Sequence, residues 1–343
     1  MIPTVAGTSS RSTSTDEQRQ VAEFKSDDSV TILPNLRFKR YFAAGAYGNV
    51  WGGEHIGKLY AVKVAKPKND ATRQRLLTEI AFGLSLAGNP NLVPMLEAHT
   101  TNDSRFVMVM PYVKYNLFDL CVHRTKGRYF SVDLINGFLY DIATAIKYVH
   151  DRGYFYRDMK PENILISQDG HFMLADFGLI EKVPDREDSN GFCLDVSGTA
   201  EYLAPEVVCN DTASGLPADW WGLGAILWIL YTGEVVFTGT TKREVLKSVL
   251  DYSEYCSNNW HIRLGPYGAI NLLHVCPHRR AGYTEIMSLF PGGISAKARR
   301  TIMTSISRIP VNDYADELCH LPDYDNINTP HEKLTMSSIT SMM

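Results

Sequence analysis

The sequence of 343 residues predicts an α+β protein of two lobes, in which a small antiparallel β-sheet with one main helix precedes a larger, mostly helical lobe. Two observations support this fold class. Alternating apolar residues and β-branched residues are concentrated between Leu36 and Val64, as is typical of strands. After Ser131, by contrast, long stretches carry apolar residues at helical spacing. A chain of this length is sufficient for a sizeable core.

The composition changes along the chain and divides it into four expected parts. Residues 1–33 are rich in Ser, Thr and charge and have few large apolar residues, so we expect them to be disordered. We assign residues 34–111 to the small lobe and residues 112–310 to the large lobe, joined near residues 112–116. Residues 311–343 are expected to form a loosely structured tail.

The individual elements are predicted in the following order. Three strands between Leu36 and Val64 are followed by a helix over "DATRQRLLTEIAFGLSLAG", for which Asp70 is the N-cap candidate. A buried strand is predicted over "RFVMVMPYV". The large lobe should contain helices over "SVDLINGFLYDIATAIKYVHDRG" and "ADWWGLGAILWILYTG", short strands around "NILIS" and "HFMLAD", and weaker helices up to about Pro310.

The overall composition is that of an ordinary soluble protein, with 45% hydrophobic residues, 21% charged residues and a net charge of −4. This charge gives no reason to expect nucleic acid or an anionic membrane as a partner. The six cysteines are scattered and form no C-x-x-C pair. This argues against a zinc cluster or a disulfide scaffold and fits a reducing compartment.

No targeting segment or membrane span is expected. The chain starts with the polar segment "MIPTVAGTSSRSTSTDEQRQ", which is unlike a signal peptide. The most apolar run, "GLGAILWILYTGEVVF", is too short to span a bilayer and contains Glu234, so it is interpreted as a buried core helix. These features predict a soluble protein of the cytoplasm and/or the nucleus. We expect the protein to be a monomer.

Two charged residues lie inside otherwise apolar segments, where a buried charge is costly unless it has a partner. Lys63 lies in the predicted strand "YAVKVAK", and Glu79 lies in "LLTEIAF" on the predicted helix. If the two side chains pair with each other, the lysine is directed at an anion. The alternative is that both are independent surface charges.

Polar residues also gather around the predicted strand "NILIS". The loop before it, "YRDMKPENIL", contains Arg157, Asp158, Lys160, Glu162 and Asn163. Further along, "ADFGL" places Asp176 two residues before a glycine. The oxygen atoms of Asn163 and Asp176 are of the kind that Mg²⁺ prefers, so these two residues can share such a cation.

The segment "FAAGAYGNV" has two glycines, Gly45 and Gly48, between two predicted strands. Such a pair fits either an ordinary hairpin turn or a lid over phosphate groups. A phosphate lid usually carries a third glycine, and Ala43 stands in that place. The segment alone does not decide between the two interpretations.

A series of motifs then appears in one order along the chain: the glycine-rich loop, "AVK", a helix glutamate, "RDMKPEN", "DFG", "GTAEYLAPE" and "DWWGLG". In this order and at this spacing, the chain resembles the eukaryotic protein kinase family over roughly Leu36 to Pro310. Lys160 and "GTAEYLAPE" are similar to the serine/threonine branch. "GTAEYLAPE" and "DWWGLG" are also similar to the group of cyclic-nucleotide-dependent kinases, although the tail lacks the F-x-x-F docking motif of that group.

This resemblance implies ATP and Mg²⁺ as cofactors and Ser or Thr hydroxyls of proteins as phosphoryl acceptors. The matching catalytic positions are Asp158, Lys160, Lys63, Glu79 and Thr199, and the matching magnesium ligands are Asn163 and Asp176. The matching nucleotide-binding positions are Phe42, Ala43, Ala44, Gly45, Ala46, Tyr47, Gly48, Asn49, Val50, Ala61, Lys63, Met110, Pro111, Val113, Asn116 and Leu165.

The resemblance also implies a role for each catalytic position. Asp158 would accept the proton of the substrate hydroxyl, and Thr199 would help to shape the hydroxyl site. Lys63, held by Glu79, would contact the α- and β-phosphates, while Lys160 would neutralise charge on the transferred group. Phosphoryl transfer depends mainly on such positioning and electrostatic stabilisation.

Other matches are architectural or regulatory. The resemblance implies a buried ion pair between Glu206 and Arg280, and it implies that Asp219 ties a long helix to the catalytic loop. Asp195 stands where regulated relatives carry a phosphothreonine, with Arg157 and Arg75 as candidate partners. We therefore hypothesise activity that is largely independent of loop phosphorylation, while the alternative is a solvated loop aspartate.

The leading interpretation is an active serine/threonine protein kinase. The alternative is a pseudokinase or scaffold that binds ATP or a protein partner without turnover. Such proteins usually lack the lysine, the base or the metal-binding aspartate, whereas Lys63, Asp158 and Asp176 are all present here.

Overall fold

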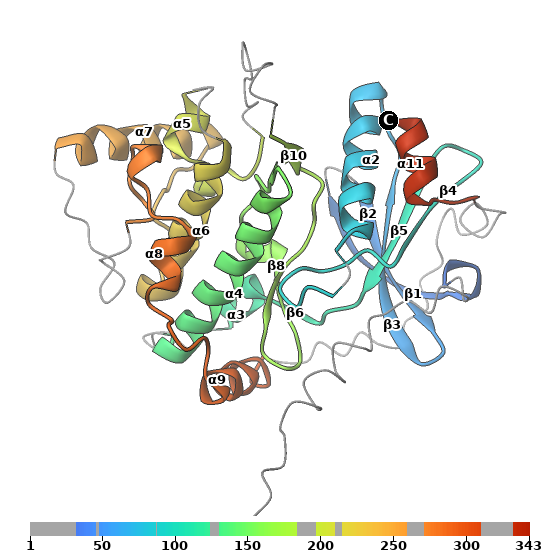
Figure 1. Ribbon diagram of the computed structural model, residues 1–343, viewed down its shortest axis with the longest axis horizontal. Coiled ribbons are helices and arrows are strands. Elements are labelled where there is room, and N and C mark those ends of the chain that lie inside the picture. Colours follow the sequence, from blue (N-terminus) through green and yellow to red (C-terminus); the bar gives the residue numbers. More distant parts are fainter. Residues whose placement is uncertain are drawn as a thin grey trace, which may run out of the picture.

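The computed structural model describes residues 32–45, 48–86, 88–123, 130–183, 197–209, 215–258, 271–309 and 332–343. A smaller lobe built on one β-sheet stands beside a larger, mainly helical lobe, and the chain passes between them just after Pro111 (Figure 1). The two-lobed α+β fold predicted from the sequence is confirmed. Within the described residues we find no helix whose length and hydropathy would allow it to span a bilayer.

The sheet of the smaller lobe is antiparallel throughout, with the strand order β1-β2-β3-β5-β4-β11. Its strands are β1 (Arg37–Gly45), β2 (Gly48–His55), β3 (Lys58–Ala65), β4 (Glu97–Thr100), β5 (Phe106–Pro111) and β11 (Glu332–Lys333). The three strands predicted before Val64 correspond to β1, β2 and β3, and the predicted buried strand corresponds to β5.

Strand β5 is apolar along its length because both faces of the sheet are covered. Phe106 and Met108 belong to a core cluster with the apolar face of α2 (Asp70–Leu84). Val107 and Val109 point to the opposite face and pack in a second cluster that includes Leu33. The alternation of side chains along a strand therefore places one residue in each core in turn.

Helix α2 begins one residue earlier than the predicted cap implied. Asn69, not Asp70, is the N-cap, because its side chain accepts a hydrogen bond from the Thr72 amide and the Thr72 hydroxyl accepts one from the Asn69 amide. This reciprocal capping box satisfies two amides that the helix itself leaves without partners. Asp70 becomes the first helical residue, where its negative charge is favourable.

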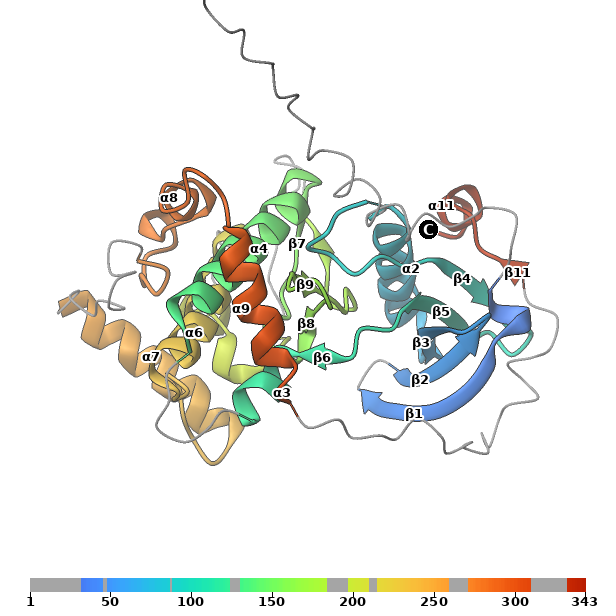
Figure 2. The ribbon, with the colours of Figure 1, turned by 90° about the horizontal axis from the view of Figure 1, so that it is seen from below.

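The larger lobe is built around α4 (Val132–Asp151) and α6 (Gly215–Thr232), which correspond to the two long helices predicted from the sequence. Around them lie α3 (Leu117–Val122), α5 (Pro205–Val208), α7 (Lys242–Asn258), α8 (Tyr283–Met287) and α9 (Ala296–Ile306) (Figures 1 and 2). One small sheet contains β6 (Tyr115–Asn116), β8 (Ile164–Ile166) and β9 (Phe172–Leu174), and the other contains β7 (Tyr154–Phe155) and β10 (Glu181–Lys182).

The end of the chain differs from the prediction of a loosely structured tail. Residues 332–343 return to the smaller lobe, where β11 pairs with β4 and α11 (Met336–Met342) lies along α2 (Figure 1). Leu334 and Ile339 are buried in the same cluster as the apolar face of α2. The prediction was wrong for residues 332–343 because a single short turn of apolar residues, Met336, Ile339 and Met343, does not identify a helix without the surface of α2 on which it packs. We call residues 332–343 the C-terminal strap.

The expected boundary at residue 33 also moves. Leu33 is completely buried under the sheet and starts a short 3-10 helix, η2 (Leu33–Asn35). The amides of Ile32 and Leu33 donate hydrogen bonds to the carboxylate of Glu97 on β4, at 3.2 and 2.6 Å. Lys333 of the C-terminal strap lies 3.8 Å from the same carboxylate. Glu97 thus contacts the segment that precedes the first strand of the sheet and the strap that follows the larger lobe in the chain.

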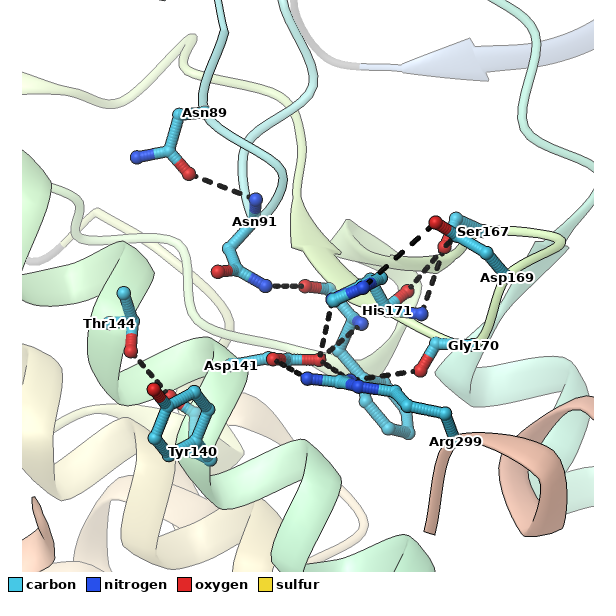
Figure 3. A network of polar contacts seen from close by, with 11 residues as sticks. Asn89, Asn91, Tyr140, Asp141, Thr144, Ser167, Asp169, Gly170, His171 and Arg299 are labelled. Carbon is cyan, nitrogen blue, oxygen red and sulfur yellow. Dashed lines mark hydrogen bonds and ion pairs between the residues drawn. The ribbon is translucent and has the colours of Figure 1, made fainter. Parts of the chain in front are cut away.

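A buried ion pair fixes α9 against α4 (Figure 3). Both oxygens of Asp141 on α4 accept hydrogen bonds from the Arg299 guanidinium on α9, and one of them also accepts a bond from the Phe172 amide. Arg299 donates further to the Gly170 carbonyl, 3.0 Å away. The network therefore holds the β8–β9 hairpin, which leads into the segment containing Asp176.

Replacing Asp141 with asparagine is expected to lower the free energy of unfolding by about 3 kcal/mol at neutral pH, because it leaves the Arg299 charge uncompensated in a mostly buried place. Burial alone would raise the pKa of Asp141, but the hydrogen bonds and charges of Arg299 and His171 outweigh it and lower the pKa. A lowered carboxyl pKa means that this stabilisation is present above the ordinary value of 3.8 and is lost as the pH falls through the folded-state pKa.

Urea unfolding followed by circular dichroism, at pH 7 and at decreasing pH, checks this prediction. The matched control is Asp151→Asn on the same helix, since Asp151 is exposed and pairs only along the surface with Lys147. That change should alter the free energy of unfolding by less than about 0.5 kcal/mol. Two results would contradict the role of Asp141 in this ion pair. One is an equal loss of the free energy of unfolding in the two variants. The other is a free energy of unfolding that falls as steeply with decreasing pH in Asp141→Asn as in the wild type.

Candidate active site

Lys63, Glu79 and Asp176 meet between the two lobes. Strand β3 supplies Lys63, and α2 supplies Glu79. The ammonium of Lys63 donates to Oε1 of Glu79 at 2.6 Å and to Oδ1 of Asp176 at 2.8 Å. Only 6% of Lys63 and 3% of Glu79 are exposed, so the ion pair predicted from two charges in apolar segments is present.

Lys63 and Asp176 each stabilise the charged form of the other. Burial by itself would lower the pKa of Lys63, but the attraction of Glu79 and Asp176 outweighs it and raises that pKa. Burial would likewise raise the pKa of Asp176, yet the charge of Lys63 and the hydrogen bonds from Lys63 and the Gly178 amide lower it. Lys63 therefore stays cationic and Asp176 anionic around neutral pH.

Gly178 lies close against this cluster, where a side chain would have little room. A Cβ atom at this position would lie 3.2 Å from Oδ1 of Asp176, 3.3 Å from the Lys63 ammonium and 3.4 Å from Oε2 of Glu79. Asp176 itself has a positive φ of 53°, a left-handed conformation that aspartate tolerates better than most residues. The "DFG" segment thus turns its carboxylate toward Lys63.

A second polar cluster surrounds Asp158 on the loop between β7 and β8. The carboxylate is buried, and its Oδ2 accepts hydrogen bonds from Lys160 at 2.6 Å and from the Asn163 amide nitrogen at 2.8 Å. Asn163 also donates to the Asp158 carbonyl at 3.0 Å. Because both side-chain donors use Oδ2, Oδ1 is the oxygen through which Asp158 can engage a further group.

Helix α6 fixes the backbone of this loop through hydrogen bonds to the side chain of Asp219. Asp219 is buried and accepts hydrogen bonds from the amides of Tyr156 and Arg157, at 2.8 and 2.9 Å, and from His150 at 2.8 Å. The Tyr156 hydroxyl donates to the Ala175 carbonyl at 2.5 Å, which joins the Asp158 loop to the residue before Asp176. The connection expected for Asp219 is therefore present.

The predicted ion pair between Glu206 and Arg280 is also present. The two guanidinium nitrogens lie 2.5 and 2.8 Å from the two carboxylate oxygens, and the pair is buried. Arg280 donates further to the carbonyls of Pro217 and His274. The pair holds α5 against the start of α6.

The apolar positions expected around a nucleotide base lie on strands that flank the junction of the lobes. Ala61 on β3 is paired with Met110 on β5, and Leu165 on β8 is paired with Asn116 on β6. Among the apolar side chains of the predicted set, those that are half-buried are Val50, Ala61, Met110, Val113 and Leu165. Partly exposed apolar side chains at this junction are compatible with an aromatic ligand.

The glycine-rich segment forms a hairpin. Strands β1 and β2 pair as far as Gly45 opposite Gly48, while Ala46 and Tyr47 lie outside the described residues. Ala43 and Ala44 are paired with Val50 and Asn49, so the position of the missing glycine is extended backbone that alanine adopts readily. Gly48 has a φ of 148°, and a Cβ there would lie only 2.6 Å from the Val64 carbonyl oxygen.

Two predicted positions, Asn116 and Thr199, are placed differently from the rest. The Asn116 side chain accepts a hydrogen bond from the Asp119 amide at 2.7 Å and so caps α3. Thr199 lines a cavity together with Arg157, Met159 and Ser197, whereas the hydrogen bonds of Asp158 go to Lys160 and Asn163. Asp195 lies outside the described residues.

Asn163 and Asp176 provide a donor set that fits a magnesium ion. Asn163 donates from its side-chain nitrogen to Asp158, so its carbonyl oxygen can serve a cation. Asp176 uses Oδ1 for Lys63 and Gly178, and its side chain is 40% exposed. One amide oxygen and one carboxylate oxygen are hard ligands of the kind that Mg²⁺ takes, with water and phosphate completing its shell.

Two residues important to the site were missed at the level of sequence. Glu181 on β10 forms an ion pair with Arg157, the residue before Asp158. Asp141 could have been noticed by the rule that identified Lys63, because it is a charged residue in the apolar segment "GFLYDIATAI". Glu181 offered no such signal, since it lies between the apolar Ile180 and the charged Lys182 rather than inside an apolar segment.

A two-lobed fold with a lysine held by two carboxylates between its lobes, beside a loop aspartate with a lysine two residues on, is that of a phosphotransferase of the kinase class. Comparison with known proteins agrees. The family model described as the protein kinase domain matches residues 37–288.

Ribosomal protein S6 kinase alpha-4 of Homo sapiens is 32% identical over 249 residues, covering 68% of this chain and 31% of the relative. Ribosomal protein S6 kinase alpha-2 of Mus musculus is 30% identical over 212 residues, covering 60% and 28%. Ribosomal protein S6 kinase alpha-6 of Danio rerio is 31% identical over 212 residues, with the same coverage. This chain thus spans about a third of the length of these relatives. It belongs to the protein kinase family, in the serine/threonine branch.

Proposed function

We propose that this chain is an active kinase that transfers the γ-phosphoryl group of Mg·ATP to serine and threonine hydroxyls of proteins. One observation carries the proposal: both polar clusters are complete and connected. Asp176 contacts Lys63 on one side, and the Tyr156 hydroxyl bonds to the neighbouring Ala175 carbonyl on the other. A pseudokinase would be expected to lack one of these charged groups.

ATP with its magnesium supplies the phosphoryl group and part of the positive charge when bound. Lys63 would bind the phosphates as a cation, since its two carboxylate partners keep it protonated and fix its direction. Asn163 and Asp176 would hold the metal. The half-buried apolar residues Val50, Ala61, Met110 and Leu165 would contact the base.

Asp158 would orient the substrate hydroxyl and take its proton at Oδ1, because Oδ2 already accepts two hydrogen bonds. Lys160 would neutralise charge that develops on the transferred group, and its contact with Asp158 keeps it at that place. Such fixed charges stabilise a transition state without reorganisation during the reaction. Thr199, on the segment that lines the neighbouring cavity, would contribute to the acceptor site.

The test is phosphoryl transfer from γ-labelled ATP to three peptide libraries, each with a fixed central Ser, Thr or Tyr and random flanking positions. The expected result is incorporation into Ser and Thr but not Tyr, loss of incorporation with EDTA, and activity that follows the protein across a gel-filtration peak. If ATP raises the melting temperature but no library is labelled, the protein is the pseudokinase or scaffold instead. Labelling of Tyr peptides would overturn the assigned specificity.

A further inference from the structure

The arginine that precedes Asp158 is held by a carboxylate built into the sheet. The Arg157 guanidinium forms an ion pair with Glu181 on β10. Only 9% of the Arg157 side chain is exposed, against 37% for Glu181. The Arg157 guanidinium carbon also lies 5.9 Å from the centre of the buried Phe155 ring. Arg157 is thus largely enclosed, and Glu181 reaches it from the more open side.

The register of β7 and β10 explains why Glu181 meets Arg157. The two strands are antiparallel, with Glu181 opposite Phe155 and Lys182 opposite Tyr154. Arg157 follows Phe155 by two residues, so its side chain lies on the same face, diagonal to Glu181 and within reach of a long side chain. A hydrogen bond from the Val183 amide to the Gly153 carbonyl, 2.7 Å long, continues the pairing.

The backbone of Arg157 needs such support because its conformation is strained. Its φ is 71°, and a left-handed conformation costs a residue with a side chain about 1–2 kcal/mol. The Arg157 amide is held by Asp219, so α6 fixes one part of the residue and β10 fixes the other. Because Asp158 is the next residue, the direction of its carboxylate depends on how firmly Arg157 is held.

Arg157 also contacts the segment that leads to Thr199. A Cβ atom on Gly198 would lie 3.1 Å from the Arg157 carbonyl oxygen, which shows how closely the two backbones approach. Arg157, Ser197 and Thr199 line the same cavity. A phosphate near an arginine can order such a segment by supplying nearly two negative charges. Glu181 supplies one negative charge to the same guanidinium without any modification.

We propose that Glu181 is a positioning residue for Asp158: through Arg157 it holds the catalytic loop in its working geometry, so that activity does not require a phosphate group on this protein. The proposal rests on the proposed kinase function. The proposal requires the ion pair between Arg157 and Glu181. It does not require that Glu181 be the sole partner of Arg157.

The test compares Glu181→Gln, which has the same shape but no charge, with Glu181→Asp, which keeps the charge on a shorter side chain. The matched control is Lys182→Gln, an exposed residue next to Glu181 on the same strand. Each protein is treated with a phosphatase, freed of it, and assayed for kcat and for the KM of ATP with the best Ser or Thr peptide. Melting temperatures show whether each variant is folded.

We expect phosphatase treatment to leave the wild-type kcat within a factor of about two of its initial value. The reason is that a phosphatase does not remove the carboxylate charge of Glu181. Glu181→Gln should lower kcat by at least about tenfold with little change in the KM of ATP, because a displaced base slows the chemical step more than it weakens nucleotide binding. Glu181→Asp should recover most of that loss, and Lys182→Gln should behave as the wild type.

A double-mutant cycle separates positioning from a general effect on folding. In an Arg157→Ala background, Glu181→Gln should change kcat by less than about twofold, since the two residues act through one contact. The proposal is overturned by a Glu181→Gln variant with wild-type kcat, by an undiminished effect in the Arg157→Ala background, or by a wild type that phosphatase inactivates. A wild type that is inactive under every condition would instead refute the kinase function itself. If Glu181→Gln does not fold, the proposal is decided by the phosphatase result and by the kcat of Glu181→Asp, which must stay close to the wild-type value.

Discussion

Replacing Asp158 with asparagine is expected to lower kcat by about a thousandfold, within the range that a positioned general base contributes. Asparagine has the shape of aspartate, and its side-chain oxygen can still accept hydrogen bonds from Lys160 and Asn163. It has no carboxylate, however, to receive the proton of the substrate hydroxyl. Nucleotide binding involves other residues, so the KM of ATP should stay within about threefold of the wild-type value.

Steady-state rates at saturating peptide, over a range of ATP concentrations, measure both constants. Asp151→Asn, an exposed residue at the end of α4, is the control for the same chemical change and should leave both constants unaltered. A variant of Asp158 that keeps more than a tenth of the wild-type kcat would show that this carboxylate is not the base. A large increase in the KM of ATP with normal kcat would place it in nucleotide binding instead.

The second large effect is expected from removing the C-terminal strap, residues 332–343. Leu334 is 3% and Ile339 1% exposed, and both pack against the α2 face formed by Leu76, Leu77 and Ile80. Burial of each side chain is worth about 1.5–3 kcal/mol, so their loss should destabilise the smaller lobe by about 3–6 kcal/mol. This is a large part of the 5–15 kcal/mol that is typical of a whole protein.

Activity should fall with stability, because α2 carries Glu79 and positions it against Lys63. Thermal unfolding and the KM of ATP are the measurements. Within the full-length chain, Ile339→Ser and Met336→Ser make a matched pair on α11, one side chain buried and the other half exposed. The first should lower the melting temperature and the second should not. A truncated protein as stable and active as the wild type would show that the strap packs on α2 without supporting it.

The parts of the fold that could be predicted are those with a local or chemical signature. Continuous apolar periodicity identified β5, α4 and α6, and the cost of burying a charge identified the pair of Lys63 and Glu79. The loop around Asp158 was recognised because several polar residues that share one chemistry follow one another within a few positions. These signals exist in the chain before any tertiary contact forms.

The parts that could not be predicted depend on distant contacts. Asn69 displaced Asp70 as the helix cap because Thr72 completes a reciprocal pair of hydrogen bonds with it. The partner of Arg157 depends on the register between two strands of two residues each, too short to show alternation. The C-terminal strap takes its structure from the surface of the smaller lobe, and nothing within residues 332–343 requires that structure.

The C-terminal strap also changes how the two lobes are linked. Helix α9 belongs to the larger lobe and β11 to the smaller one, so the covalent chain joins the two lobes a second time. A segment attached in this way docks intramolecularly, and its effective concentration at α2 is set by the covalent attachment. The fraction of molecules in which the strap contacts α2 therefore does not depend on the concentration of the protein. If the chain were cut between α9 and β11, the strap would be a separate peptide. Its contact with α2 would then depend on concentration, as the binding of a separate subunit does.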